Sequence, residues 1–389
     1  MDVPAVRAAL AELGLDAWLL FDFRGQNAIA RELVGVGGGR KATRRWFVLI
    51  RRDAEPSVLE SALEQGVVPP LPGSRAAYRG WRELEAWLRG ALAGCARVAM
   101  EYSPAAAVPY VGRVDAGTVE LVRSCGVEVV SSGDLVQLFE ARWTPAQAAL
   151  HETAAAGVLA AKDELFDHVR ARLGSITETQ ALAFLGERLA ARGLVSEHPS
   201  VVAVNDHAAS PHFDTGPADD RTIGAGDVLL VDTWAKVGDE PDAVYADVTW
   251  MAYGGDEPPA RLTQVWDAVR DARDAAVAFA LEATAAGRPV HGYEVDRAGR
   301  AVIEERGFGD RFVHRLGHSL GREVHGNGVN MDDLETRDER LLVPGLGFTV
   351  EPGVYLPGEL GVRSEVNVVV GEGGARVTTE PQRQLILLR

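Results

Sequence analysis

The sequence predicts an N-terminal α/β domain followed by a larger domain that opens with long helices and continues with strands. The chain of 389 residues is longer than one ordinary core accommodates, since most domains hold about 100–150 residues. Helical and strand patterns alternate through the first part of the chain, which is typical of a mostly buried sheet with helices packed on it. A helix-start signal at Thr144 then begins a new pattern. We therefore predict domains over residues 1–142 and 143–389.

The N-terminal elements follow from the spacing of apolar residues. A helix is expected from residue 3 and ends before Gly14, which favours a left-handed helix terminus. The elements expected after it are strands over 17–22, 46–50, 97–102 and 127–131 and helices over 83–92 and 134–141. This alternation indicates a single α/β layer structure.

The second domain opens with two capping boxes, in which a threonine and a glutamine satisfy each other's backbone N–H groups at a helix start. The first joins Thr144 to Gln147, with Pro145 at the position where helices tolerate proline best. The second joins Thr177 to Gln180. The elements expected further on are strands over 228–233 and 245–252, helices over 261–286 and 293–306, and several terminal strands.

Composition excludes several classes of function. A net charge of −16 repels phosphate backbones, so we do not expect a nucleic-acid partner. No apolar run reaches the roughly 18 residues that span a bilayer, and the first residues do not resemble a signal peptide. Cys95 and Cys125 form neither a disulfide framework nor a metal knuckle. We expect a cytoplasmic protein with reduced thiols and no membrane partner.

Five candidate metal ligands follow one another along the second domain. Each carboxylate lies beside β-branched or apolar residues of an expected strand, and a hairpin between the first two would bring both to one face of a sheet. In chain order the five are Asp232, Asp247, His318, Glu351 and Glu365.

Four carboxylates in apolar surroundings require cations. Without them, some of the carboxylates would have to take up protons. Two divalent ions would balance the four negative charges, and one imidazole would complete a mixed oxygen and nitrogen ligand set. Such a set suits Mn²⁺, Fe²⁺ or Co²⁺, with Zn²⁺ as a further candidate. Two ions sharing a water would activate it and polarise a carbonyl, which hydrolyses acyl bonds without a nucleophilic side chain.

The ligand order and three motifs resemble the pita-bread metallopeptidases, which include methionine aminopeptidase, aminopeptidase P, prolidase and the metal-free creatinase. The motifs are Gly-His with a second histidine at His325, Thr-Val-Glu-Pro-Gly at 349–353, and Gly-Val-Arg-x-Glu at 361–365. The domain over 1–142 is similar to the N-terminal domain of prolidase, aminopeptidase P and creatinase. The resemblance implies a fold class of an α/β N-terminal domain plus an α+β pita-bread catalytic domain.

The resemblance also implies roles for individual residues. The five ordered ligands would bind the metals, with Asp247 and Glu365 bridging two ions, most favourably Mn²⁺. Glu351 would in addition handle the proton of the attacking water. Histidines would contact substrate and stabilise the oxyanion, and Arg363 would support the ligands from behind. The histidines with such roles are His212, His325 and, near the proline pocket, His314. His207 is expected to face solvent.

Some positions depart from the family pattern. The stretch between Asp232 and Asp247 is longer than usual, and Trp250 stands where the family has arginine. Val366 and Gly326 replace acidic residues after two of the motifs. No ligand is lost, so metal binding is still expected, while substrate preference and metal choice stay open because outer residues tune both.

Two further stretches carry weaker signals. Prolidases hold the dipeptide carboxylate with an arginine, and counting back from Glu351 the match falls on Arg337, within the charged stretch 332–340. The glycine-rich stretch 35–41 suggests a phosphate-binding loop, but it does not lead from a strand into a helix as that motif requires. We expect an ordinary loop there.

The leading interpretation is an Xaa-Pro dipeptidase acting as a homodimer on dipeptides. The nearest alternative is aminopeptidase P, which removes the first residue of longer Xaa-Pro peptides. A pita-bread protein that binds peptide without catalysis, and a creatinase-like metal-free hydrolase, belong to other classes. The complete ligand set argues against both, because creatinase lacks that set and a binding protein would have no use for four buried carboxylates.

Overall fold

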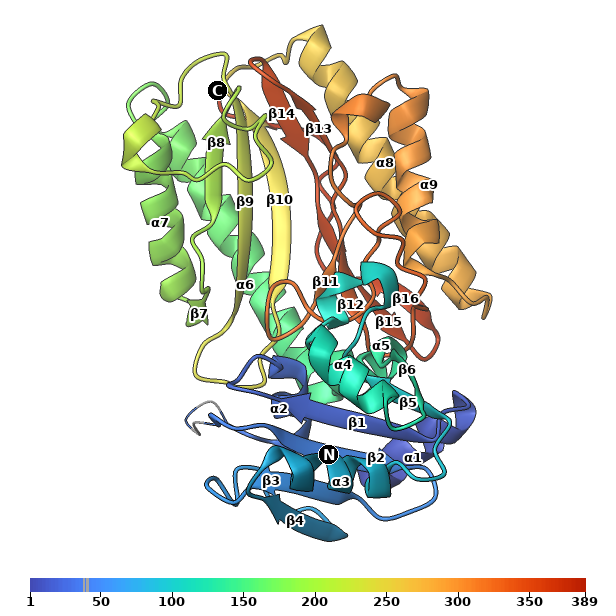
Figure 1. Cartoon of the computed structure of the whole chain (residues 1–389). Helices are drawn as coiled ribbons and strands as arrows, with labels where there is room; N and C mark the ends of the chain where they lie inside the picture. Colours follow the sequence, from blue (N-terminus) through green and yellow to red (C-terminus); the bar gives the residue numbers. More distant parts are fainter. Residues whose placement is uncertain (38, 40–41) are drawn as a thin grey trace. The chain divides into compact units, whose positions relative to one another are not determined.

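The computed structural model describes residues 1–37, 39 and 42–389. Gly38, Arg40 and Lys41, part of the stretch for which a loop is expected, lie outside the described residues. The chain divides into two compact units, residues Met1–Ala141 and Arg142–Arg389 (Figure 1). Along the described ranges, no helix has the length and apolar character needed to traverse a bilayer.

The first unit contains a six-stranded mixed sheet in the order β4-β3-β2-β1-β5-β6. Its strands are β1 (Ala17–Asp22), β2 (Trp46–Arg51), β3 (Ser57–Ser61), β4 (Ser74–Tyr78), β5 (Arg97–Met100) and β6 (Glu128–Ser131). Its helices are α1 (Val3–Glu12), α2 (Ala28–Val34), α3 (Trp81–Ala91), α4 (Ala116–Arg123) and α5 (Gly133–Val136), the last continued by a π-helical turn at Gln137–Ala141. The short 3₁₀ turns are η1 (Pro104–Ala106) and η2 (Pro109–Val111).

Alternate residues of the central strands supply two separate cores. Trp18 and Leu20 of β1 pack with α1 and α2, whereas Leu19 and Phe21 pack with α3 and α4. Because successive side chains of a strand point to opposite faces, a sheet covered on both sides needs apolar residues at every position, and all of β1 is buried. The predicted α/β architecture is confirmed, although β3, β4, α2 and α4 were not expected.

The second unit begins with two capped helices, α6 (Pro145–Arg170) and α7 (Glu178–Ala190). Both predicted capping boxes are present. At the first, the Gln147 backbone N–H donates to Thr144 Oγ1 at 3.2 Å and the Thr144 N–H donates to Gln147 Oε1 at 2.9 Å. Each box satisfies two N–H groups that a helix start leaves without intrahelical partners.

The strands beside these helices form one sheet in the order β17-β10-β9-β7, with β8 also paired to β9. They are β7 (Leu194–Val195), β8 (Val201–Val204), β9 (Val228–Val237), β10 (Ala246–Tyr253) and β17 (Ile386–Leu387). Helix α6 packs against β9 and β10. On that face Trp250 of β10 joins the core, and the Lys162 ammonium lies 3.4 Å from the centre of its indole ring.

The remaining strands form a second sheet, β11-β12-β15-β16, and a hairpin, β13-β14. They are β11 (Ser319–Leu320), β12 (Gly347–Val350), β13 (Gly353–Leu356), β14 (Leu360–Arg363), β15 (Val366–Gly371) and β16 (Gly374–Val377). Helices α8 (Ala260–Ala285) and α9 (Gly292–Glu305) pack on each other, and α8 covers β14 and β16. The remaining short turns are η4 (Pro217–Asp219) and η5 (Gly309–Arg311). Within this unit the strands lie between α6 and α7 on one side and α8 and α9 on the other (Figure 1).

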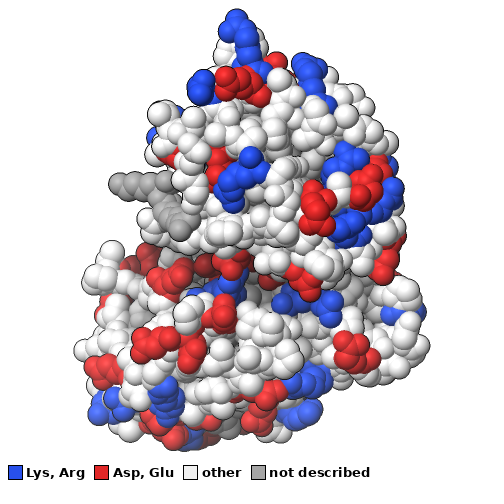
Figure 2. Space-filling model, turned by 90° about the horizontal axis from the view of Figure 1, so that it is seen from below, with Lys and Arg blue, Asp and Glu red and all other residues white. Residues whose placement is uncertain are grey.

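The surface mixes both signs of charge. Acidic and basic side chains are interspersed on the face drawn in Figure 2. Many charged side chains of the protein form pairs, such as Arg97 with Glu128 at 3.5 Å and Arg261 with Glu359 at 3.2 Å. Exposed pairs of this kind contribute about 0–1 kcal/mol each to stability, so we attribute the stability of the fold to its buried cores.

Candidate metal centre

The β9–β10 ladder places two predicted ligands on one face of the sheet. Asp232 pairs in register with Thr249, and Asp247 pairs with Trp234. Residues two apart in a strand share a face, so Asp247 and Thr249 both point to the side on which Asp232 lies. Val248 and Trp250 point the other way, into the core under α6. The prediction that a hairpin would bring both aspartates to one face agrees with this register.

The other three predicted ligands lie at strand ends of the neighbouring sheet. His318 immediately precedes β11, Glu351 immediately follows β12, and Glu365 lies between β14 and β15. Backbone contacts join these strands to β10: the Glu365 N–H donates to the Thr249 carbonyl at 3.2 Å. The Asp247 N–H donates to Asn367 Oδ1 at 3.0 Å, and Asn367 Nδ2 donates back to the Asp247 carbonyl at 2.6 Å.

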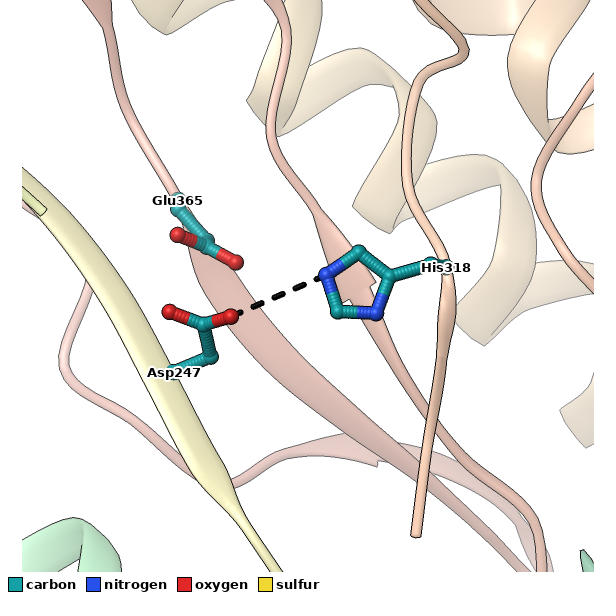
Figure 3. A group of neighbouring side chains, drawn as sticks. All are labelled: Asp247, His318 and Glu365. Atoms are coloured by element: carbon teal, nitrogen blue, oxygen red, sulfur yellow. Dashed lines mark ion pairs between the residues drawn. The ribbon is translucent and has the colours of Figure 1, made fainter. Parts of the chain in front are cut away.

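Asp247, His318 and Glu365 point toward one another in the interior (Figure 3). One ligand atom of each lies within 4.8 Å of the others, and His318 Nε2 lies 3.6 Å from Asp247 Oδ2. His318 Nδ1 lies 3.1 Å from the Ser319 carbonyl, to which it can only donate. That hydrogen bond leaves the Nε2 lone pair directed at the carboxylates, which is the tautomer that binds a metal.

Asp232 and Glu351 complete the cluster. Thr249 Oγ1 lies 2.9 Å from Asp232 Oδ1 and 2.9 Å from Glu365 Oε2, so one hydroxyl connects two carboxylates. Glu351 Oε1 lies 3.4 Å from His318 Nε2 and accepts a hydrogen bond from Thr349 Oγ1 at 3.1 Å. The structure therefore brings together all five residues proposed as ligands.

Two carboxylate oxygens of this cluster are buried without a hydrogen-bond donor. They are Asp247 Oδ1 and Glu365 Oε1, for which the described part of the chain provides no partner. Burial raises the pKa of both carboxyls well above the ordinary value, and the neighbouring carboxylates raise it further. Burial likewise raises the pKa of Glu351, opposed by His318 and Arg363. Unsatisfied carboxylate oxygens around a neutral imidazole are a donor set that fits divalent cations.

Arg363 lies beside the candidate ligands and brings a positive charge next to their carboxylates. Its guanidinium pairs with Asp232, and its Nε lies 3.9 Å from Glu351 Oε2. It also donates to Thr249 Oγ1 at 3.0 Å and to the Tyr355 hydroxyl at 3.1 Å. One guanidinium cannot balance four carboxylates, so a net negative charge is left for a bound cation to neutralise.

Two of the predicted substrate histidines are exposed beside the ligands. The His325 ring meets the His318 ring edge-on, with 4.4 Å between centroids. The proximity of His318 lowers the pKa of His325 to about 3, and His212 contributes in the same direction. His212 is exposed, and the carbonyl of the preceding Pro211 accepts a hydrogen bond from Arg363 at 3.3 Å. Both imidazoles therefore border the centre.

His314 is engaged entirely within the protein. Its Nδ1 donates to the Arg315 carbonyl at 2.7 Å, and its Nε2 lies 2.8 Å from the Tyr355 hydroxyl. Burial, assisted by Arg363, lowers the pKa of His314 to about 3, and burial raises that of Tyr355 to about 12. A neutral His314 thus accepts from Tyr355, which accepts from Arg363. The contact of His314 with the centre runs through this chain of hydrogen bonds.

Arg337 is not among the residues that the structure brings together at the centre. Its guanidinium carbon lies 4.6 Å from the centre of the Tyr293 ring, and its Nε lies 3.3 Å from Glu339 Oε1. The side chain is 55% exposed. The expectation that His207 faces solvent is wrong, since only 5% of this residue is exposed and both of its ring nitrogens contact carboxylates.

Sequence reasoning missed two residues that organise the centre. Thr249 connects Asp232 to Glu365, and its position two residues after Asp247 was an available signal, since it must share that face. Tyr355 joins His314 to Arg363. Nothing in the local pattern of Tyr355 marks it, because the contact depends on the β13–β14 pairing.

The chain is similar in sequence to several known proteins. Residues 149–372 match the sequence model of metallopeptidase family M24, and this stretch is more than half of the chain. The Xaa-Pro dipeptidase of Pyrococcus furiosus is 32% identical over 187 residues, or 48% of this chain and 49% of that protein. The probable dipeptidase PepE of Mycobacterium tuberculosis is 32% identical over 227 residues, or 57% of this chain and 56% of that protein. The chain thus spans about half the length of the curated relatives it matches.

A solved structure matches over nearly the whole chain. Dipeptidase PepE from Mycobacterium ulcerans is similar with a TM-score of 0.75 and 26% identity, covering 99% of this chain and 96% of that one. This likeness, together with the family match, confirms the expected fold class of an α/β region plus an α+β pita-bread region.

Proposed function

Because the chain belongs to metallopeptidase family M24, we propose that it hydrolyses the peptide bond preceding proline, with Xaa-Pro dipeptides as substrates. The observation that carries this proposal is the pair of buried, donor-free oxygens of Asp247 and Glu365 facing His318. A protein retains so costly an arrangement where a cation occupies it. The names of the relatives supply the substrate class.

The proposed cofactor is a pair of divalent ions, with Mn²⁺ as the first candidate and Co²⁺, Fe²⁺ or Zn²⁺ as alternatives. The oxygen-rich donor set with a single imidazole favours this choice. Asp247 and Glu365 would bridge the ions, because each has an oxygen to which no group of the described residues donates. Asp232, His318 and Glu351 would supply the remaining ligands.

The proposed chemistry divides between the ions and the side chains. Bound divalent ions would supply a water activated for attack and a polarised carbonyl. Glu351, whose carboxyl has a raised pKa, would accept a proton at its carboxylate and return it to the leaving imide nitrogen. His325, neutral at physiological pH because its pKa is lowered to about 3, would donate its ring N–H to the developing oxyanion. His212, which is also exposed and lowers the pKa of His325, would contact the substrate.

The remaining assignments extend the proposal. Arg337 is the candidate for holding the carboxylate of a dipeptide, and His314 is proposed to act near the proline pocket by positioning Tyr355. Residues 1–142 would form the prolidase-type N-terminal domain and 143–389 the catalytic domain, which the division of the structure after Ala141 supports. We further propose a cytoplasmic homodimer.

The test is hydrolysis of Leu-Pro beside Leu-Pro-Gly by protein stripped with a chelator and reloaded with Mn²⁺. We expect cleavage of the dipeptide, dependence on the added metal, and about two Mn²⁺ per chain by elemental analysis. Cleavage of the tripeptide alone would assign aminopeptidase P activity in place of dipeptidase activity. Cleavage of neither, in protein that holds the metal, would overturn the proposed substrate class.

A further inference from the structure

Contacts with Arg363 and with strand β14 hold the loop that carries His212 beside the candidate metal centre. We call residues 205–213, which follow β8, the His212 loop. The Pro211 carbonyl accepts from Arg363 at 3.3 Å. A Cβ atom at Gly361 would lie 1.8 Å from the Ala208 carbonyl oxygen, so the loop backbone touches β14 directly. His212 itself is exposed, and its ring position therefore depends on how firmly this backbone is fixed.

A buried histidine fixes the loop at its base. His207 Nδ1 lies 2.9 Å from both carboxylate oxygens of Glu178, the first residue of α7. His207 Nε2 lies 2.9 Å from Asp219 Oδ2 in η4. The imidazole therefore lies between two carboxyl groups, with each ring nitrogen within hydrogen-bond distance of one of them. We call these three residues, Glu178, His207 and Asp219, the imidazole clasp.

Glu178 connects the clasp to the surrounding backbone. Its Oε1 accepts from the Val204 N–H at 2.7 Å, at the end of β8, and its Oε2 accepts from the Arg221 N–H at 3.2 Å. Glu178 is fully buried, and burial raises the pKa of its carboxyl while these donors and His207 lower it. Charge-assisted hydrogen bonds to a buried carboxylate are among the strongest in proteins.

The clasp also reaches the far side of His212. The His207 ring stacks on the Phe213 ring, with 4.2 Å between centroids and 23° between planes. Because His207 and Phe213 flank the segment 208–212, this stack joins the two ends of the segment. The charged neighbours of the clasp are Asp206 and Arg221, which pair with each other, and Arg221 lies 3.9 Å from Asp219 Oδ1.

We propose that His207 is a positioning residue for His212: by tying the loop to the start of α7 and to η4, it sets where the His212 imidazole meets the substrate. The residue makes no contact with substrate in this scheme and acts only through His212. The kinetic part of this inference rests on the proposed peptidase function, and its structural part does not.

The primary test substitutes His207→Gln in the full chain loaded with Mn²⁺. Both N–H donors of glutamine lie on one nitrogen, so they cannot replace the two ring nitrogens that face Glu178 and Asp219 from opposite sides of the imidazole. The substitution also removes the ring stack on Phe213. We expect kcat/KM for Leu-Pro to fall about 10–100-fold, the size of effect that small misplacements of a site residue produce, with bound Mn²⁺ unchanged. Asp219→Ala removes only the exposed partner (67% exposed) and should fold normally, so we expect a smaller loss in the same direction.

A double-substitution cycle distinguishes positioning from general destabilisation. In a His212→Ala background, His207→Gln should lower kcat/KM by less than about twofold, because the group it positions is already absent. Full additivity of the two losses would overturn the proposal. The matched control is His168→Gln, since His168 also stacks on a phenylalanine, Phe184, with 3.7 Å between centroids. That control should leave kcat/KM and its dependence on His212 unchanged.

Hydrogen exchange tests the structural part without catalysis. Backbone N–H groups of Ala209, Ser210 and Phe213 donate to carbonyls inside the loop at 3.1 Å each. In Mn²⁺-loaded protein we expect these amides to exchange at least about tenfold faster in His207→Gln and Asp219→Ala, and at the wild-type rate in His168→Gln. Unchanged exchange overturns the proposal even if the wild type cleaves dipeptides. Faster exchange in these two variants, combined with a wild-type protein that cleaves no dipeptide, supports the clasp and overturns the proposed function instead.

Discussion

Glu101 in the first unit and Glu365 at the metal centre are both almost completely buried, but their surroundings differ. Glu101 Oε1 accepts from Trp18 Nε1 at 2.7 Å and from Ser132 Oγ at 3.1 Å, and its Oε2 accepts from Asn27 Nδ2 at 2.8 Å. Glu365 accepts from Thr249 alone, and its Oε1 has no donor within the described chain.

The difference between these two carboxylates separates structural from functional burial. Burial raises the pKa of both, but three hydrogen bonds oppose the shift at Glu101, whereas neighbouring carboxylates increase it at Glu365. A carboxylate whose oxygens are all satisfied needs no further ligand. One that faces other carboxylates without donors needs a cation, and this is the physical basis for assigning the metal to the second unit.

The largest effect should come from changing Glu365 itself. Glu365→Gln keeps the shape but removes the charge and a ligand oxygen, so we expect hydrolysis of Leu-Pro to be abolished and bound Mn²⁺ to be lost. Asp247→Asn should behave alike. Elemental analysis and a dipeptide assay measure both. If either variant kept its full content of Mn²⁺, the buried carboxylates of the centre would not be needed for metal binding, and the contrast between Glu365 and Glu101 would be lost.

A variant of His325 separates loss of catalysis from loss of metal, because His325 lies beside the candidate ligands but is not proposed as one of them. We expect His325→Ala to lower kcat about 10²–10³-fold, as for loss of one donor to an oxyanion, with Mn²⁺ content unchanged. The control is His168→Ala, at a histidine that no contact joins to the centre among the described residues. Equal loss of metal and activity in His325→Ala would show that His325 supports the ligands and would end its assignment to the substrate.

At Glu101 the expected effect is on folding alone. Glu101→Gln places an amide N–H₂ among three donors, leaving at least one buried donor without an acceptor, which costs about 1–3 kcal/mol of unfolding free energy. Kinetic constants of the Mn²⁺-loaded variant should stay at wild-type values. Urea unfolding of wild type and variant measures the difference. If the Glu101→Gln protein were as stable as the wild type, the three hydrogen bonds to Glu101 would not be what stabilises its buried carboxylate.

The sequence indicated which residues gather at the candidate metal centre, but it did not indicate the buried cluster around Glu101. Candidate ligands such as Asp232 and Glu351 stand at the ends of apolar strand patterns, where a local signal marks them. The Glu101 cluster joins four residues from distant parts of the chain through side-chain hydrogen bonds. No hydrophobic periodicity or residue spacing in the sequence predicts such contacts.

Within the second unit, failures of prediction also follow from long-range geometry. The bond from Tyr355 to His314, which occupies the second nitrogen of that imidazole, depends on the β13–β14 hairpin. The burial of His207 depends on α7 and η4, which come together only in the folded unit. Local patterns fix which residues begin a helix or end a strand, whereas the partners of a polar side chain are set by packing between elements.

The smallest expected effect is on how the free energy of unfolding depends on pH, and it tests the comparison of the two buried carboxylates directly. Without metal, the pKa of Glu365 lies well above its ordinary value of 4.5 in the folded chain, and Asp247 is shifted likewise. Below the ordinary values both states hold these protons. As pH rises, the unfolded chain releases them first, so the folded state binds more protons and the free energy of unfolding falls with pH.

Bound divalent ions keep the two carboxylates ionised in the folded protein and should remove this fall. We therefore expect chelated protein to lose thermal stability between about pH 5 and pH 8, while Mn²⁺-loaded protein loses less. Glu101 is shifted upward in both forms, so its contribution cancels in the difference between the two curves. Chelated Glu365→Gln should show a shallower decline than chelated wild type. Parallel melting curves for chelated and loaded wild type would mean that the carboxylates of the centre carry no unbalanced charge, and the contrast with Glu101 would then have no functional meaning.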